Sequence, residues 1–298
     1  MVCGVSYCFG AFSLTAFMST LWKDYALLDS GDGEKCERFG DVVMIRPEPQ
    51  ALWPKADPQA AVWRTAPLVY ARDGREGEWY RRERVADRWT IGWEDLRFSI
   101  RPTSFKHTGL FPEQEANWQW LRTRLTPGAR VLNLFGYTGG ATLACASVGC
   151  DVTHVDASKP VVTWGRENLE LSGLAERSVR WIVDDAQKFV AREIRRGSVY
   201  DAILMDPPAF GRGPEGEIWK FEEHVPKLLE QCQKLLAPQH GILLVNAYSL
   251  GFSAKVIENV VRTFVPDRAL IASTDLLLTE QTSRAFALPA GVAVRATW

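Results

Sequence analysis

The 298-residue sequence lacks the patterns that define several large classes of protein. It has six cysteines and four histidines, but no C-x-x-C pair and no spacing typical of a metal site. Its net charge of -1 excludes a general attraction to nucleic acid, so any such contact needs a local basic patch. Residues 1–18 carry no Lys or Arg, unlike a signal peptide, and are too short and interrupted for a membrane span. We therefore expect a cytoplasmic protein without metal or membrane partners.

The length and composition predict one large α/β domain with a smaller companion. Apolar residues make up 46% of the chain and charged residues 24%, as in most globular proteins. Globular sequence begins near Met18, so we interpret residues 1–20 as an N-terminal extension and Met18 as a candidate start. There is no internal repeat or low-complexity tract, and nothing in the sequence specifies an oligomeric state.

Residues 21–104 are predicted to form a small β-rich domain. Short β-type segments are interrupted by turn residues, and five prolines between Pro47 and Pro67 exclude a regular helix there. Six of the twelve tryptophans lie in the first hundred residues, where they either build the core or stack on bases. The core is the more common role. The predicted strands begin at Tyr25, Asp41, Trp79, Trp89 and Leu96.

From Asn117 onward, strands and helices alternate. Repeated βα units predict a parallel sheet that is covered by helices on both faces. The predicted strands are 130–135, 151–156, 178–183, 202–205, 241–246, about 268–272 and 285–296. The predicted helices lie near 117–125, 140–148, 160–171, 187–196, 217–236 and 253–264.

The most informative segment is the apolar run 202–205, which leads directly into Asp206-Pro207-Pro208. Two prolines end the strand abruptly and stiffen the backbone that follows. Ligands bind at the carboxyl ends of parallel strands, so Asp206 lies where chemistry can occur. The alternative is a strand-ending loop with a solvated carboxylate.

Three other strand ends carry residues that suit a nucleotide. The strand 130–135 leads into a turn with Gly136, Gly139 and Gly140, and glycines let a backbone approach a ligand closely. Asp156 ends the next strand, where a carboxylate can hold ribose hydroxyls. Asp185 follows the third strand and either accepts from an adenine amine or caps the next helix.

Together these features resemble the class I S-adenosylmethionine-dependent methyltransferases. The segments 133–140 (NLFGYTGG), 206–210 (DPPAF) and 106–114 (KHTGLFPEQ) are similar to those of the RlmI/RlmK-type bacterial 23S rRNA methyltransferases and their uncharacterised relatives. The resemblance covers about residues 105–298, the predicted methyltransferase domain, and implies a Rossmann-like mixed sheet of seven strands. No separate PUA-like RNA-binding domain is evident.

The resemblance also implies roles for individual residues. Asp206, Pro207 and Pro208 would present the target atom, Asp156 would hold the ribose and Asp185 the adenine amine of S-adenosylmethionine. The remaining residues assigned to the cofactor pocket are Phe111, Gln114, Asn133, Phe135, Gly136, Tyr137, Thr138, Gly139, Ala157 and Ala186. The cofactor carries the activated methyl group, so the protein mainly supplies position and electrostatics.

One departure from the resemblance bears on the acceptor atom. Cytosine-C5 members of this group use a cysteine just after the strand that follows Asp-Pro-Pro, because carbon there needs covalent activation. Here that stretch is Val-Asn-Ala-Tyr-Ser-Leu-Gly, and Cys232 lies on the preceding helix. A nitrogen acceptor is therefore favoured over cytosine C5. Phe210, Asn246 and Tyr248 are candidate substrate contacts, with a buried strand-end tyrosine as the alternative.

Evidence in the sequence for an RNA partner is local. Arginines at 81, 82, 84, 192, 195 and 196 form basic groups, although such residues are commonly only solvated. The loop 211–216 is glycine-rich and suited to ordering over a substrate. The prediction is a methyltransferase acting on a base in ribosomal or other structured RNA. The alternatives are a small-molecule or protein methyltransferase, a catalytically silent RNA-binding relative, and a nicotinamide-dependent oxidoreductase, which the missing G-x-G-x-x-G disfavours.

Overall fold

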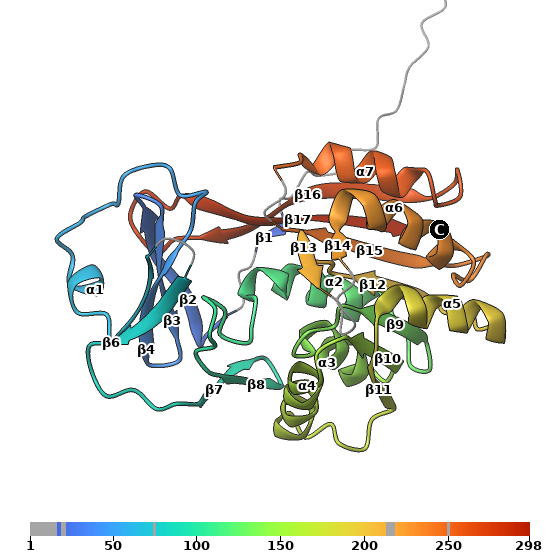
Figure 1. The fold of residues 1–298 in the computed structure, drawn as a ribbon, viewed down its shortest axis with the longest axis horizontal. Coiled ribbons are helices and arrows are strands. Elements are labelled where there is room, and N and C mark those ends of the chain that lie inside the picture. The colour runs from blue at the N-terminus through green and yellow to red at the C-terminus, as the bar shows by residue number, and fades with distance from the viewer. Residues whose placement is uncertain (1–16, 19–21, 74–75, 213–217, 249–250) are drawn as a thin grey trace, which may run out of the picture.

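A computed structural model describes residues 17–18, 22–73, 76–212, 218–248 and 251–298. Most of the predicted extension, and the loop at 213–216, lie outside the described residues. A mixed sheet forms one half of the molecule and a smaller antiparallel-rich sheet forms the other (Figure 1). The predicted α/β fold with a β-rich N-terminal part is confirmed.

The large sheet has the strand order β1-β16-β17-β15-β12-β9-β10-β11. Seven strands match the predicted set, and all pair in parallel except β17, which is antiparallel to both neighbours. Two residues from the predicted extension add an eighth strand by pairing with β16. The strands are β1 (Phe17–Met18), β9 (Arg130–Leu134), β10 (Asp151–Asp156), β11 (Val179–Val183), β12 (Ala202–Met205), β15 (Ile242–Ala247), β16 (Leu270–Thr279) and β17 (Ala287–Thr297).

Alternate residues of the central strands enter two separate cores, as the two-residue repeat of a strand requires. Leu204 packs with the helices on one face, whereas Ile203 and Met205 pack with those on the other. The first face is covered by α2 (Glu115–Arg124), α3 (Gly140–Ser147) and α4 (Lys159–Leu171). The second is covered by α5 (Ala186–Arg196), α6 (Phe221–Gln233) and α7 (Ala254–Arg262). Each predicted helix is present, with ends shifted by a few residues.

The N-terminal sheet has the order β2-β3-β4-β5-β6, and a separate hairpin, β7–β8, follows it. Its strands are β2 (Tyr25–Gly31), β3 (Glu34–Phe39), β4 (Val42–Pro47), β5 (Leu68–Asp73), β6 (Glu76–Arg81), β7 (Trp89–Trp93) and β8 (Leu96–Ile100). β3 and β5 were not predicted. β3 is rich in charged residues, whereas β5 begins with the apolar run Leu-Val-Tyr-Ala. The exclusion of helix between Pro47 and Pro67 was wrong, because α1 (Ala61–Arg64) forms one turn in the proline-free stretch 59–66.

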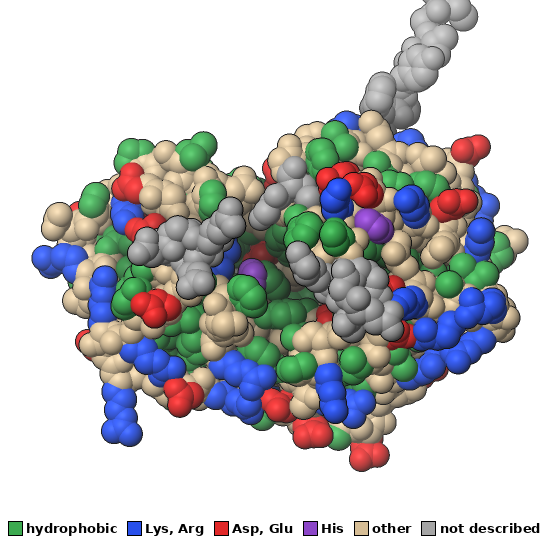
Figure 2. All heavy atoms as spheres, viewed as in Figure 1, with side chains coloured by type: hydrophobic (Ala, Val, Ile, Leu, Met, Phe, Trp, Pro, Cys, Tyr) green, Lys and Arg blue, Asp and Glu red, His purple; other side chains and the backbone are tan. Residues whose placement is uncertain are grey.

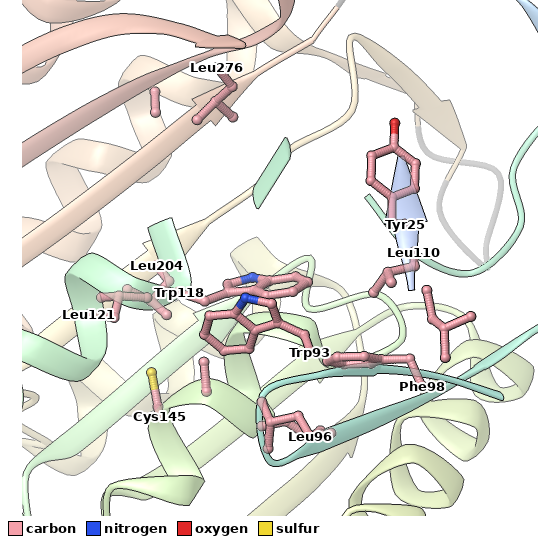
Figure 3. Close-up of a cluster of buried hydrophobic side chains, with 14 of the residues drawn as sticks. Tyr25, Trp93, Leu96, Phe98, Leu110, Trp118, Leu121, Cys145, Leu204 and Leu276 are labelled. Carbon is pink, nitrogen blue, oxygen red and sulfur yellow. The ribbon is translucent and has the colours of Figure 1, made fainter. Parts of the chain in front are cut away.

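The two halves share one hydrophobic core. Trp118 of α2 stacks on Phe98 of the β7–β8 hairpin and meets Trp93 edge to face, with ring centroids 5.5 and 5.4 Å apart (Figure 3). Tyr25 of β2 and Leu204 of β12 belong to the same cluster. Of the six early tryptophans, two are buried and four are half-buried, so the predicted core role is confirmed. The domain boundary at residue 104 remains a prediction.

The β16–β17 hairpin extends from the large sheet to the N-terminal sheet (Figure 1). The backbone N–H of Gln281 donates to the carbonyl of Leu27 at 2.9 Å. Arg284 donates to Asp29 at 2.9 Å and also to the backbone of Ser30 and Pro54. These bonds join the tip of the hairpin to the N-terminal sheet.

Candidate methyltransferase site

A cleft of about 660 Å³ lies between the two halves, at the carboxyl ends of the central strands. Figure 2 shows the molecule hollowed at this position, with hydrophobic side chains on the floor. Eleven predicted site residues line it: Phe111, Phe135, Tyr137, Asp156, Ala157, Asp185, Asp206, Pro207, Pro208, Phe210 and Tyr248. A small inner cavity of about 50 Å³ is lined by five more, Gln114, Asn133, Gly136, Thr138 and Asn246. Gly139 and Ala186 line neither space.

The glycine turn after β9 has an unusual backbone. Phe135 and Tyr137 have φ angles of 56° and 48°, in the left-handed region that non-glycine residues rarely adopt. Gly136 lies between them, and a Cβ there would fall 2.4 Å from the buried His154 ring. Gly139, with φ of 87°, forms the N-cap of α3. Strained backbone of this kind persists only where the surrounding contacts enforce it. Here Phe135 and Tyr137 line the cleft.

Two predicted cofactor residues support the turn through their side chains. The Thr138 hydroxyl donates to the carbonyl of Gly109 at 2.5 Å, and the Asn133 amide donates to Thr142 at 2.9 Å. Both are buried. Their predicted contact with the cofactor stays a prediction, and it would involve backbone atoms for Thr138.

Asp156 ends β10 and its carboxylate already accepts two hydrogen bonds. The donors are the backbone N–H groups of Tyr137, at 3.0 Å, and Ser158, at 2.9 Å. Burial raises the pKa of Asp156, and these two bonds partly offset that rise. Because each carboxylate oxygen accepts more than one hydrogen bond, lone pairs remain for a diol in the cleft.

Asp185 caps the helix that follows β11. Its side chain accepts from the backbone N–H of Lys188 at 2.9 Å, as an N-cap residue does. The capping alternative is therefore correct. Asp185 also lines the cleft, so its role toward an adenine amine stays a prediction that the cap does not exclude.

Asp206 is the most perturbed carboxyl group in the cleft. Burial, followed by the nearby charge of Glu113, raises its pKa to about 8. Its Oδ1 atom is inaccessible to solvent and has no hydrogen-bond partner among the described residues. A buried acceptor without a donor is costly, which points to a polar group of a ligand as its natural partner. The solvated-loop alternative is thus wrong.

Tyr248 is placed by a hydrogen-bonded chain that starts on β17, the strand paired with β15. The Arg295 guanidinium donates to Asn117 at 2.9 Å, and the Asn117 amide donates to Gln114 at 2.7 Å. Gln114 donates to the Tyr248 hydroxyl at 2.7 Å. Asn117 also donates to Asn246 at 3.0 Å, so two of the three candidate substrate contacts, Asn246 and Tyr248, belong to one network. Asn246 is buried in it, whereas Tyr248 reaches the cleft.

The N-terminal sheet contributes cleft residues that were not predicted from the sequence. Lys35, Arg46, Glu48 and Gln50 line the cleft opposite the strand ends. Arg46 forms a two-pronged ion pair with the fully buried Glu37. Burial opposes the charge of Glu37, but Arg46 and Lys35 hold its pKa below the ordinary value. No local pattern marks these positions, because only tertiary packing brings them to the cleft.

The segment before α2 adds two more titratable groups that sequence analysis quoted without assigning a role. His107 lines the cleft, and burial together with nearby cations lowers its pKa to about 4. Glu113 lies in the 3-10 turn η1 (Pro112–Gln114), and burial raises its pKa to about 7. Their presence in the motif 106–114 was the signal that could have identified them.

The polar groups that line the cleft fit S-adenosylmethionine. The cleft has carboxylates at the ends of the second, third and fourth strands of the parallel set, a glycine turn at the first, and a buried orphan acceptor. Among the described residues, no group of three His, Cys, Asp or Glu side chains is arranged to hold a metal ion. In that same part of the chain, no helix is long and apolar enough to cross a membrane.

The strand order and the cleft define the fold of the class I methyltransferases. The family model for S-adenosylmethionine-dependent methyltransferases matches residues 59–264, and the chain belongs to this family, whose cofactor is S-adenosylmethionine. The match begins inside the β-rich part, before the predicted domain boundary.

Individual relatives agree with this assignment. The S-adenosylmethionine-dependent methyltransferase structure from Agrobacterium tumefaciens is 39% identical, with a TM-score of 0.88 and coverage of 93% of this chain and 91% of that one. The methyltransferase SMU.776, complexed with SAH, shares the fold at 17% identity, with a TM-score of 0.73 and coverage of 94% and 76%. Ribosomal RNA large subunit methyltransferase I of Aeromonas salmonicida is 32% identical over 197 residues, which is 62% of this chain and 46% of that protein. The chain thus matches about half the length of this curated relative.

Proposed function

We propose that this protein transfers a methyl group from S-adenosylmethionine to a nitrogen of a base in ribosomal RNA. The observation that carries the proposal is the Oδ1 of Asp206, which has no partner among the described residues and is held at a stiff Pro207-Pro208 turn in the cleft. A base N–H would supply the missing donor and would be oriented by the bond. The cofactor supplies an activated methyl group when bound.

The absence of a cysteine at the cleft supports nitrogen over cytosine C5. No described residue that lines the cleft or the inner cavity is a cysteine, and the Cys232 thiol is fully buried among the helices of the second face. A thiol needs access to the base to activate its carbon. Burial also raises the pKa of Cys232, which opposes formation of the thiolate nucleophile.

Two further observations support an RNA substrate. The curated relative that matches 197 residues is named for methylation of large-subunit ribosomal RNA. Lys and Arg side chains gather on the flank over α5, where Arg192, Arg195 and Arg196 lie (Figure 2). Arg192 and Arg196 are paired with Asp184 and Glu193, so they would reach phosphates only by exchanging partners. A ribosomal RNA substrate would place the protein in the cytoplasm.

The proposal is tested with total RNA from a strain that lacks this protein. Purified protein and tritiated S-adenosylmethionine should transfer label to large-subunit ribosomal RNA, and Asp206→Ala should abolish most of that transfer. Label that enters only a protein or small-molecule fraction would reject RNA as substrate. Binding of S-adenosylmethionine without any transfer, to RNA or to the other fractions, would indicate a silent relative.

A further inference from the structure

Glu113 is a buried carboxyl group that lines the same cleft as Asp206. It is 4% exposed, lies on η1 and belongs to the N-terminal side of the site rather than to a strand end. Both carboxyl groups line the cleft. Each lies close enough to Tyr248 to raise the pKa of its hydroxyl, and Glu113 also hydrogen-bonds that hydroxyl.

The position of Glu113 is fixed from two sides. Its neighbour Gln114 donates to the Tyr248 hydroxyl at 2.7 Å, which ties η1 to the end of β15. On the other side lie the charged groups of the N-terminal sheet. The charged and titratable groups that act on Glu113 or are acted on by it are Lys35, Glu37, Arg46, Tyr25, Asp206 and Tyr248.

We propose that Glu113 is a further catalytic residue, which with Asp206 forms a carboxyl pair that holds the acceptor N–H and takes its proton. In the step, the bond between nitrogen and the methyl carbon forms while the sulfur–carbon bond breaks, and that electron pair stays on sulfur. The N–H proton passes to a carboxylate of the pair. This inference rests on the proposed nitrogen acceptor.

The electrostatics of the pair agree with this role. With pKa values of about 7 for Glu113 and about 8 for Asp206, both carboxyl groups titrate near neutral pH. A base works best when its pKa lies near the operating pH. Two close carboxyl groups that repel each other retain a proton more readily and release it when a cationic or proton-donating group enters between them.

Sinefungin tests the pair without any RNA. It is an S-adenosylmethionine analogue in which CH–NH2 replaces S–CH3, so its ammonium should lie where the methyl group is transferred. S-adenosylhomocysteine lacks this ammonium and serves as the reference ligand. Calorimetric titrations of both ligands give, for each variant, the ratio of the dissociation constant of S-adenosylhomocysteine to that of sinefungin. Weaker binding of sinefungin lowers this ratio. The Glu113→Gln substitution keeps an acceptor for Tyr248 and removes only the charge.

We expect Glu113→Gln to weaken sinefungin by about 10-fold to 100-fold, since a hydrogen bond to a charged group contributes roughly 1.5–3 kcal/mol. The affinity for S-adenosylhomocysteine should not change, which also shows that the variant is folded. Glu113→Asp should recover part of the ratio. Glu230→Gln, on the exposed side of α6, should match the wild type. Wild-type sinefungin affinity should rise from pH 6 to pH 8.5, and less so in Glu113→Gln.

An unchanged ratio of the two dissociation constants in Glu113→Gln would overturn the role of Glu113. That result would stand whether or not ribosomal RNA is methylated. Conversely, a lower ratio combined with no label in RNA would reject the RNA substrate and keep the carboxyl pair. The two failures are therefore distinguishable.

Discussion

Replacing Gly136 by alanine should destabilise the protein through one identifiable collision. The added Cβ would lie 2.4 Å from Cε1 and 2.5 Å from Nδ1 of His154. Favourable carbon contacts need about 3.5–4.0 Å, so the ring or the turn must move by about 1 Å. The ring cannot move freely, because its Nδ1 is hydrogen-bonded to the Thr142 hydroxyl at 2.8 Å and its centroid lies 4.6 Å from that of the tilted Trp181 ring. Overpacking of this kind costs about 1–3 kcal/mol.

The assay is urea unfolding of Gly136→Ala, His154→Ala and the double variant, monitored by circular dichroism. Removing the ring makes room for the methyl group, so the cost of Gly136→Ala should nearly vanish in the His154→Ala background. Gly211→Ala is the matched control, because its Cβ would meet only ordinary contacts at 3.4 Å or beyond. Equal costs of Gly136→Ala with and without the His154 ring would refute this explanation.

Three further outcomes are expected. Asp156→Asn should weaken binding of S-adenosylhomocysteine by about 10-fold or more, since a charged acceptor is lost, and an unchanged calorimetric affinity would remove Asp156 from the site. The folded-state pKa of Asp206, about 8, exceeds its ordinary value of 3.8. Its stabilising contribution is therefore complete below about pH 4 and is lost as the pH rises to about 8. In urea unfolding, the free energy of unfolding of Asp206→Asn minus that of the wild type should therefore increase as the pH rises from 5 to 8.5. A constant difference across that range would contradict the raised pKa. Arg284→Met should cost about 1–3 kcal/mol and speed hydrogen exchange in β2, because charged bonds to Asp29 and to backbone carbonyls are lost; unchanged exchange would show that the hairpin tip does not hold the N-terminal sheet.

The structure also refines how Asp156 substitutions should be designed. An alanine there would remove the acceptor for the backbone N–H groups of Tyr137 and Ser158 as well as the proposed ribose contact. Loss of affinity in that variant would therefore mix two effects. Asparagine keeps one acceptor oxygen but turns its NH2 group toward one of these two N–H donors, so the stability of each variant should be measured beside its affinity.

The strand ends were predictable because each combines a short apolar run with a residue that ends it. Asp156 and Asp206 follow buried strands, and parallel strands bring their carboxyl ends to one edge. The glycines after the first strand predicted that the backbone packs closely against another group. That this group is the His154 ring could not be predicted, because His154 lies on the neighbouring strand and no local pattern marks the contact.

The rest of the site depends on long-range packing that no local pattern encodes. Arg46 and Lys35 reach the cleft because the N-terminal sheet docks beside η1, and that docking depends on the β16–β17 hairpin. The predicted strand near 268–272 was too short for the same reason. β16 continues to Thr279 past an irregularity in its pairing at Leu276/Leu277, which interrupts the regular alternation.

The same context explains why β3 was not predicted. β3 reads as Glu-Lys-Cys-Glu-Arg-Phe, which is more polar than a typical buried strand. Its Glu37 is nevertheless fully buried, because Arg46 of the neighbouring strand neutralises it and Tyr25 donates to it at 2.9 Å. A buried ion pair of this kind becomes evident only when both strands are placed.

The most direct test of the account is nucleoside mass spectrometry of large-subunit ribosomal RNA. RNA from a strain lacking this protein would be incubated with the purified enzyme and S-adenosylmethionine, then digested to nucleosides. The account predicts one additional methylated nucleoside with the methyl group on a nitrogen, formed by the wild type and strongly reduced with Asp206→Ala. A product methylated at cytosine C5, or one formed equally well without the Asp206 carboxyl group, would contradict it.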